Sequence, residues 1–430
     1  MWVEDSFVVD SPSRFHQKAL QWAQQFDEIC FFNSHGIDDE WSNFDVSLAV
    51  KAQTTFVSDD VDTFSKIQQF VNLHADAPII PGFFSYDLKN EIEDLKSRHV
   101  DHLGFPRALF FIPEIVIQIK GSRVCITAPD PSLIFNQIQE TSFAVSTPSV
   151  FQGPVRQRWS KEAYLKAFTR MQRHIQQGDI YEVNLCQEFY ADNVKIDPLH
   201  VYQRLSQVSP TPFSCFFKIK EKYILCASPE RFLAKRKELL ISQPIKGTAK
   251  RGATATEDQA QIAALLDSKK EIAENVMIVD LVRNDLTRSA VKGTVKADRL
   301  FEIQTFQQVH QMVSTITCQK HEQTTDLQAI KNTFPAGSMT GAPKIAAMKL
   351  CDEIESARRG IYSGSIGYFA GPDCFDFNVV IRTLLYNSST SYLSFHTGGA
   401  ITNQAIGEQE YAECLLKAKG ILQALDTTLT

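Results

Sequence analysis

Short runs of β-branched and aromatic residues, paired across tight turns, mark several parts of the chain. Residues 112–119 and 124–128 lie on either side of a KGS turn. Residues 214–219 and 223–227 lie on either side of a KE pair. Such runs, separated by so few residues, predict antiparallel β-hairpins. Further strand-like runs cover residues 309–317, 361–369, 375–386 and 392–396.

Other stretches repeat their apolar residues at helical spacing. Between Ser160, a residue type that caps helix N-termini, and Gly178, which ends helices, apolar residues recur every three or four positions. Residues 257–285 include two capping-box patterns, TEDQ and SKKE, which predict two consecutive helices rather than one. Helices are also expected over residues 14–26 and 404–425.

Hairpins followed by isolated helices, without βαβ alternation, indicate an α+β fold with antiparallel sheets. The composition changes along residues 129–157, which are rich in Pro, Ser, Thr and Gln. We therefore expect a boundary within residues 140–157. It separates an N-terminal subdomain, residues 1–145, with a structural or regulatory role, from a catalytic domain, residues 155–425.

Composition narrows the class of protein. The 430 residues are 43% hydrophobic and 22% charged, which is ordinary for a soluble globular protein with a core large enough for an enzyme. A net charge of −6 argues against a nucleic-acid partner. The sequence contains no run of eighteen apolar residues, so no membrane span is predicted. The start, MWVEDSF, lacks the basic region of a signal peptide. Nine scattered cysteines without a CxxC pair fit free thiols in the cytoplasm.

The segment QPIKGTAKRG, residues 243–252, is the first candidate for chemistry. Gly247 allows a close backbone approach beside Lys246, and a lysine becomes a nucleophile when its pKa falls. A solvated basic turn is the alternative for this segment taken alone.

Two acidic pairs provide candidate metal ligands. Glu271 and Glu274 are three residues apart on a predicted helix, and Glu410 and Glu413 repeat the spacing on the last helix, with Lys417 one turn beyond. If the pairs converge, they suit Mg²⁺, which binds one or two carboxylates together with water and substrate oxygens. The alternative for each pair is a solvated helix face.

Glycine-rich segments and one arginine complete the candidates. AGSMTGAPK, residues 336–344, and TGGAI, residues 397–401, can offer backbone N–H groups to an anion, although neither matches a nucleotide-binding motif. Arg382 lies in the apolar run VVIRTLL, where a carboxylate ligand is one candidate partner. Together these features suggest a pocket for a small polyanion with a divalent metal.

Six segments in consistent order resemble the chorismate-utilising enzymes. They are PIKGT, AEN-x-MIVDL-x-RNDL, FPAGSMTGAPK, GSIGYF, IRTL and the closing GGAI with EYAE. The resemblance covers about residues 160–425. The family includes component I of anthranilate synthase and of aminodeoxychorismate synthase, isochorismate synthase and salicylate synthase. It implies large antiparallel sheets packed in a sandwich, with helices outside.

Within the family, Lys246 and Asn275 resemble the aminodeoxychorismate synthases, on the 4-aminobenzoate and folate route, and Glu182 counts against water as the nucleophile. Anthranilate synthases usually carry alanine at the position that matches Lys246, and histidine at the position that matches Asn275. The enzymes that use water carry a lysine base at Glu182. Glu182 also differs from the glutamine typical of the amine-forming branch, so its role is left unassigned. The resemblance thus implies formation of 4-amino-4-deoxychorismate from chorismate and ammonia.

The resemblance also implies roles for individual residues. Lys246 matches the residue that adds to carbon 2 of the ring, before ammonia enters at carbon 4. Glu230 matches the general acid that helps the ring hydroxyl leave. The implied Mg²⁺ ligands are Glu274 and Glu413, with Glu271 and Glu410 beside them. The implied substrate contacts are Thr248, Thr340, Tyr368, Arg382, Gly398, Gly399 and Lys417.

A partner is implied as well, because the chain has no GxCxG elbow of a glutaminase. Ammonia from glutamine would then come from a separate amidotransferase subunit. Two alternatives stay open: anthranilate formation on the same scaffold, and a catalytically inactive chorismate-binding regulatory protein.

Overall fold

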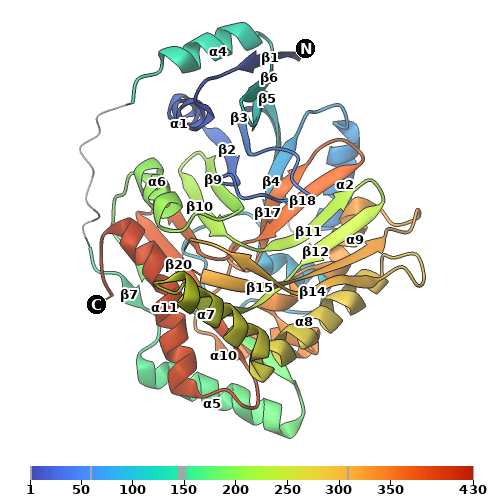
Figure 1. Ribbon diagram of the computed structural model, residues 1–430, viewed down its shortest axis with the longest axis vertical. Helices are drawn as coiled ribbons and strands as arrows, with labels where there is room; N and C mark the ends of the chain where they lie inside the picture. The colour runs from blue at the N-terminus through green and yellow to red at the C-terminus, as the bar shows by residue number, and fades with distance from the viewer. Residues whose placement is uncertain (1, 59–60, 144–150, 152, 308, 430) are drawn as a thin grey trace.

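The computed structural model describes residues 2–58, 61–143, 151, 153–307 and 309–429. Its twenty strands form one antiparallel network that folds into two layers (Figure 1). Two long strands, β3 (Val46–Val57) and β5 (Ala108–Lys120), belong to both layers. At Lys51 the backbone has φ 60°, and the register shifts between Ala52 and Thr54. This irregularity redirects β3 from one layer to the other.

The first layer runs outward from β3 and β5 on both sides. In order of pairing it contains β1 (Val3–Val8), β6 (Arg123–Ala128), β5, β3, β2 (Glu28–Asn33), β9 (Phe213–Ile219), β10 (Lys222–Ser228), β19 (Thr383–Asn387), β20 (Tyr392–Ile401) and β8 (Glu182–Ala191). The short strands β7 (Arg156–Gln157) and β16 (Gly341–Ala342) pair with β8.

The second layer continues from the other half of β5. Its strands are β4 (Ile80–Phe84), β17 (Ser365–Phe369), β18 (Cys374–Val379), β11 (Arg231–Arg236), β12 (Leu239–Gln243) and β15 (Val309–Gln319), and β13 (Ile245–Lys250) and β14 (Lys296–Thr305) both pair with β15. An apolar core lies between the layers. It joins Cys215, Phe217 and Ile224 of the first to Phe83 and Ile366 of the second.

Helices cover the outer faces. On the first layer they are α1 (Pro12–Ala23), α4 (Pro131–Glu140), α6 (Pro198–Val208) and α11 (Gly407–Leu425). On the second they are α2 (Thr63–Leu73), α8 (Lys269–Thr287) and α9 (Asp326–Thr333), while α5 (Lys161–Gln177) and α10 (Lys344–Ile354) pack on β8 and β20. The remaining helices are α3 (Lys89–Ile92), α7 (Ala255–Asp267) and the 3-10 helices η1 (Tyr86–Leu88) and η2 (Gly337–Met339). The predicted α+β sandwich with helices outside is confirmed.

Most predicted elements are confirmed, with corrections at their ends. Helix α5 begins after Ser160, whose hydroxyl accepts the Ala163 N–H, and ends at Gly178 with φ 84°. Helices α7 and α8 are consecutive, but α7 begins after Thr254, two residues before the predicted cap, because that hydroxyl accepts the Glu257 N–H. The predicted strand 375–386 is two strands, β18 and β19, because the chain turns between them at Arg382, where φ is 50°.

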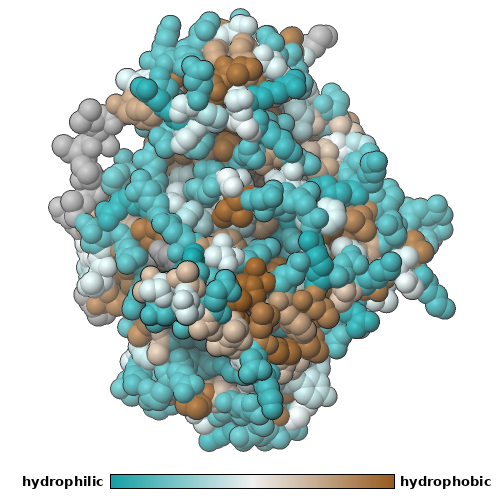
Figure 2. Space-filling view, in the orientation of Figure 1, coloured by the Kyte–Doolittle hydropathy of each residue, from teal (hydrophilic) through white to brown (hydrophobic). Residues whose placement is uncertain are grey.

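The N-terminal segment shares both layers with the rest of the chain, since β2 pairs with β9 and β4 pairs with β17. The proposed division into residues 1–145 and 155–425 stays a prediction, and residues 144–150 and 152 of its boundary lie outside the described residues. In the described part of the chain, no helix is both long enough and apolar enough to cross a bilayer. Figure 2 shows a largely hydrophilic face with apolar residues gathered over α7 and α8, where Leu266 and Val276 are exposed.

Candidate active site

Lys246, in β13, faces Glu182, the first residue of β8. Its Nζ atom lies 2.8 Å from Glu182 Oε1, and the two side chains are only 11% and 2% exposed. Burial by itself disfavours the ammonium ion, but the negative charges of Glu182 and Glu274 outweigh it and raise the pKa of Lys246. The other carboxylate oxygen of Glu182 is buried without a hydrogen-bond partner. At rest, Lys246 is therefore a cation held among acids.

Two helices bring further carboxylates to the same region. Glu271 and Glu274 lie on α8, and Glu410 and Glu413 lie on α11. The Nζ atom of Lys270 is 3.8 Å from Glu274 Oε1 and 3.5 Å from Glu410 Oε1. One ammonium group thus bridges the two helices, so the acidic pairs converge.

Two glycines make room for these carboxylates. A Cβ atom on Gly399 would lie 2.9 Å from Glu410 Oε2, and one on Gly247 would lie 3.2 Å from Glu271 Oε2. Gly247 also has φ 93°, which other residues rarely adopt. The absence of side chains lets β13 and β20 approach the acidic pairs closely.

Crowding changes the pKa values of the acids. Burial raises the pKa of Glu274 to about 7, and the charges of Glu271 and Glu182 add to the effect. Burial and the charge of Glu413 raise the pKa of Glu410. Burial acts in the same direction on Glu413, but Lys417, 2.8 Å away, lowers its pKa overall. A cation between α8 and α11 would therefore be favoured.

The donor set suits Mg²⁺ in particular. All four acids offer hard oxygen atoms, and Glu274 Oε1 is buried without a hydrogen-bond partner. Among the described residues, no three or more His, Cys, Asp or Glu side chains form a ready-made metal cage. Mg²⁺ binds a few carboxylates together with waters and substrate oxygens.

Glu230 lies between β10 and β11 and is 4% exposed. Burial raises its pKa to about 7, although the positive charges of Lys246 and Arg382 oppose the shift. Arg382 is a partly buried cation that has no ion-pair partner among the described residues, and burial lowers its pKa. The pair thus offers a protonated carboxyl beside a guanidinium able to receive a carboxylate.

The segment with Ser338 and Thr340 is fastened to β8. Thr340 is fully buried, and its hydroxyl donates to the Gly337 carbonyl at 3.1 Å. Asn184 donates its backbone N–H to the Thr340 carbonyl at 2.9 Å and its side-chain amide to the Ser338 carbonyl at 2.9 Å. Ser338 and Glu230 line one small cavity. Two distant parts of the chain are thus joined beside Glu230.

A buried guanidinium holds this junction. Arg359 donates to the Met339 carbonyl at 2.7 Å and to the Asn184 carbonyl at 2.8 Å. The Nη2 atom that donates to Asn184 also donates to the Glu355 carboxylate at 2.6 Å, and Nε donates to it at 2.9 Å. Glu355 also accepts the Cys186 N–H at 3.0 Å. Sequence reasoning missed this ion pair. Its only signal in the sequence is the i, i+4 spacing of the acid and the second arginine in ESARRG.

The role of Tyr368 as a substrate contact stays a prediction, and its side chain packs away from the other candidate residues. Tyr368 is buried between the two layers, with ring centroids 5.7 Å from Phe32 and 5.2 Å from Phe44, and lines a different cavity. The hydroxyl of Tyr362 instead lies 3.8 Å from the sulfur of Cys186, which pairs with Gly398 across β8 and β20. Tyr362 thus lies beside the paired strands that contain Gly398, and sequence reasoning missed it.

The remaining predicted contacts differ in exposure. Lys417 donates from Nζ to the Gly398 carbonyl at 2.8 Å, which joins α11 to β20. A Cβ on Gly398 would lie 2.5 Å from the Leu185 carbonyl, so strand packing by itself requires glycine there. Thr248 is exposed on β13, two residues from Lys246. These positions surround Lys246 and the acidic pairs.

Comparison with known proteins identifies the family of this chain. Residues 15–423 match the family described as chorismate binding enzyme. The chain belongs to this family. The resemblance drawn from the six motifs is confirmed.

Several relatives of this chorismate binding enzyme are informative. It is 42% identical over 281 residues to the aminodeoxychorismate synthase of Streptomyces griseus, covering 65% of this chain but only 38% of that protein. It is 34% identical over 348 residues to aminodeoxychorismate synthase component 1 of Escherichia coli, covering 80% and 76%. It is 31% identical over 382 residues to anthranilate synthase component 1 of Cereibacter sphaeroides, covering 83% and 76%.

Solved structures share the fold. Anthranilate synthase component I from Streptococcus pneumoniae superimposes with a TM-score of 0.78 at 25% identity, over 90% of this chain and 93% of that one. The menaquinone-specific isochorismate synthase of Escherichia coli superimposes with a TM-score of 0.76 at 16% identity, over 99% and 94%. The second likeness supports the fold alone.

Replacing Arg359 tests the role of the buried pair. Arg359→Met should lower the free energy of unfolding by about 3–5 kcal/mol, because Glu355 is left charged and buried without its partner. Urea unfolding measures the change. The matched control is Arg283→Met, whose ion pair with Asp280 is exposed; it should cost less than about 1 kcal/mol. Equal losses in the two variants would contradict a structural role for Arg359.

Proposed function

We propose that this chain converts chorismate and ammonia to 4-amino-4-deoxychorismate in a Mg²⁺-dependent reaction. The observation that carries the proposal is the position of Lys246, 2.8 Å from Glu182 and close to the acidic pair on α8. The relatives named aminodeoxychorismate synthase support it. The runner-up is anthranilate formation, after the similar relatives of that name.

The two charged ends of the substrate would meet opposite parts of the site. Glu274 and Glu413, with Glu271 and Glu410 beside them, would hold Mg²⁺, which would neutralise the ring carboxylate. Arg382, with no carboxylate partner of its own among the described residues, would bind the enolpyruvyl carboxylate. Between them, the protonated Glu230 would donate its proton to the ring hydroxyl as it leaves.

Lys246 would act as the nucleophile in two steps. Glu182 Oε1 first takes a proton from Nζ, and the nitrogen lone pair then bonds to carbon 2 while the hydroxyl on carbon 4 leaves as water. Ammonia next bonds to carbon 4, the double bonds shift back, and the bond from carbon 2 to Nζ breaks. Glu182 thereby gains a role that the sequence left open. It stabilises the resting ammonium and then receives its proton.

A separate amidotransferase subunit would supply ammonia from glutamine. The Escherichia coli relative is named component 1, which supports a second component for this chain too. The nine cysteines are all free thiols, which supports a cytoplasmic setting.

The product decides between the candidate functions. With chorismate, Mg²⁺ and ammonium, the purified chain should form a product that yields 4-aminobenzoate only after a suitable lyase is added. Removing Mg²⁺ with a chelator should abolish turnover, and glutamine in place of ammonium should not support it. Anthranilate fluorescence without the lyase would establish the runner-up. Folded protein that consumes no chorismate would instead support a catalytically inactive, chorismate-binding regulatory protein.

A covalent adduct is expected when ammonia is withheld. Chorismate and Mg²⁺ alone should leave part of the enzyme carrying chorismate minus water on the peptide that contains Lys246, because nothing displaces the lysine. Intact-mass and peptide analysis detect it. Lys246→Ala should carry no adduct and lose turnover. Lys246→Arg keeps the cation but cannot be deprotonated, so near-normal activity in that variant, with no adduct in the wild type, would exclude covalent catalysis.

The pH dependence should report Glu230. Its carboxyl is protonated below its pKa of about 7. The value of kcat/KM for chorismate, at saturating Mg²⁺, should therefore fall as pH rises through 7, by about tenfold per pH unit. Glu230→Gln should lower the rate by about a hundredfold or more and remove this alkaline limb. Asp280→Gln, an exposed acid on α8, is the control and should keep the wild-type profile. An unchanged limb in Glu230→Gln would assign the proton to another group.

A further inference from the structure

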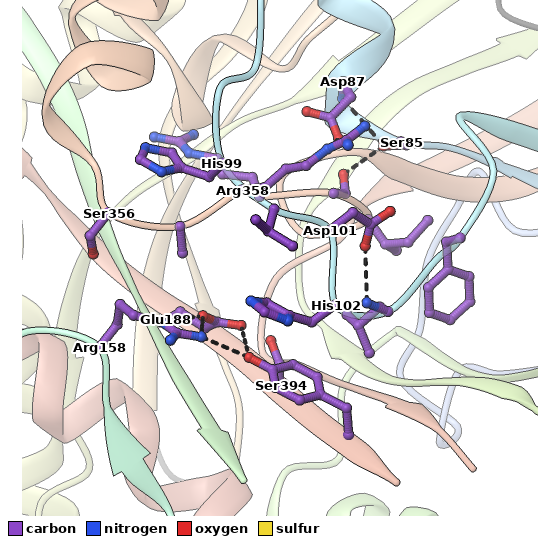
Figure 3. Close-up of a pocket in the computed structure, with 18 residues that line it drawn as sticks. Ser85, Asp87, His99, Asp101, His102, Arg158, Glu188, Ser356, Arg358 and Ser394 are labelled. Atoms are coloured by element: carbon purple, nitrogen blue, oxygen red, sulfur yellow. Dashed lines mark hydrogen bonds and ion pairs between the residues drawn. The ribbon is translucent and has the colours of Figure 1, made fainter. Parts of the chain in front are cut away.

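A second cavity lies at the far end of β8 and β20 from Lys246. It has a volume of about 180 Å³ and is bordered by the loop of residues 99–105, by residues 356–361 and by Glu188 and Ser394 (Figure 3). No residue assigned above to the metal, to the substrate or to proton transfer lines it. A cavity of about 150 Å³ accommodates a benzene ring, so this one has room for a single-ring ligand.

Three polar atoms in residues that line this cavity have no hydrogen-bond partner within the described part of the chain. They are the hydroxyl oxygens of Ser356 and Ser394 and the Nε2 atom of His99, all buried. Ser394 is fully buried. Buried polar groups are nearly always hydrogen-bonded, so three unpartnered polar atoms in residues that line one cavity set this region apart from the rest of the interior.

Two ion pairs line the cavity, and their arginines are more exposed than their carboxylates. Figure 3 shows the pair Arg158–Glu188 on one side and Arg358–Asp87 on the other. The carboxylates are 6% and 3% exposed and have further donors in Tyr392 and Ser97, whereas the guanidinium groups are 25% and 24% exposed. Ligand atoms therefore meet the cations rather than the buried acids.

One acid, Asp101, lies at the exposed loop. Its Oδ1 atom accepts the N–H groups of Leu103 and Gly104 at 3.0 and 2.9 Å, so it serves the loop backbone.

Flat and apolar surfaces complete the lining. The ring of His102 stacks on Tyr392, with centroids 4.9 Å apart and 24° between the planes. Leu103, Phe105 and Ile361 add apolar surface. We propose that this cavity binds a small organic anion consisting of one ring and one carboxylate, with the carboxylate on the arginines and the ring against His102.

Benzoate and its neutral counterpart benzamide test the proposal by calorimetry, without chorismate or turnover. Wild-type protein should bind one benzoate, and benzamide and inorganic phosphate at least tenfold more weakly, because each lacks either the charge or the ring. Ala357→Leu fills the cavity without removing a hydrogen bond, and Arg158→Gln removes one cation; each should weaken benzoate binding at least tenfold. Arg156→Gln, which loses only an exposed ion pair with Asp192, is the matched control and should bind as the wild type does.

A variant at the other site separates the two cavities. Arg382→Gln should bind benzoate like the wild type, because Arg382 does not line this cavity. Loss of binding in Arg382→Gln with full binding in Ala357→Leu would place benzoate at the candidate active site and overturn the proposal. Phosphate binding as tight as that of benzoate would also overturn the proposal. The absence of any binding heat up to about 10 mM benzoate would do the same and would indicate that the cavity holds only water. None of these results depends on the enzymatic reaction.

Discussion

The candidate active site depends on one buried ion pair that makes no contact with the proposed chemistry. Arg359 joins Glu355, which caps the C-terminus of α10, to the backbone of Asn184 in β8 and of Met339 in η2. A guanidinium has five donors in a fixed plane, so it fixes direction as well as distance. Because a charge this deep is unfavourable without partners, the three segments are stable only in the arrangement that satisfies it. That arrangement places Glu230, Ser338 and Glu182 in one region.

The same constraint explains an unusual strand. Side chains alternate along a strand, so Glu182, Asn184, Cys186 and Glu188 of β8 share one side. Polar side chains facing the interior of a sandwich require partners, and here Lys246 meets the first and Arg158 the last. Six residues of strand span about 20 Å. Lys246 of the candidate active site and the cavity beside Arg158 thus lie at opposite ends of one polar row, with Arg359 between them.

Local patterns predicted the hairpins, the helices and the acidic pairs, because each depends on neighbouring residues. The helical spacing of Glu271 and Glu274 places them on one face whatever the rest of the chain does. The convergence of that face with α11 depends on packing and on Lys270, which no periodicity reveals. Tyr368 and Tyr362 lie six residues apart in similar apolar surroundings, so sequence could not distinguish them. Only the pairing of Cys186 with Gly398 shows which tyrosine lies beside the strands that contain Gly398.

Two carboxyls of the site share a pKa of about 7 for different reasons, and this separates their roles. Burial alone raises the pKa of Glu230, and every charge near it opposes the shift. The pKa of Glu274 is raised by burial and also by the negative charges of its neighbours Glu271 and Glu182. A divalent cation between α8 and α11 would relieve that repulsion and replace the proton of Glu274, since carboxylates bind metals only when deprotonated. Glu230 has no such repulsion to lose. In the proposed mechanism, a metal held by Glu274 would therefore leave Glu230 its proton to donate.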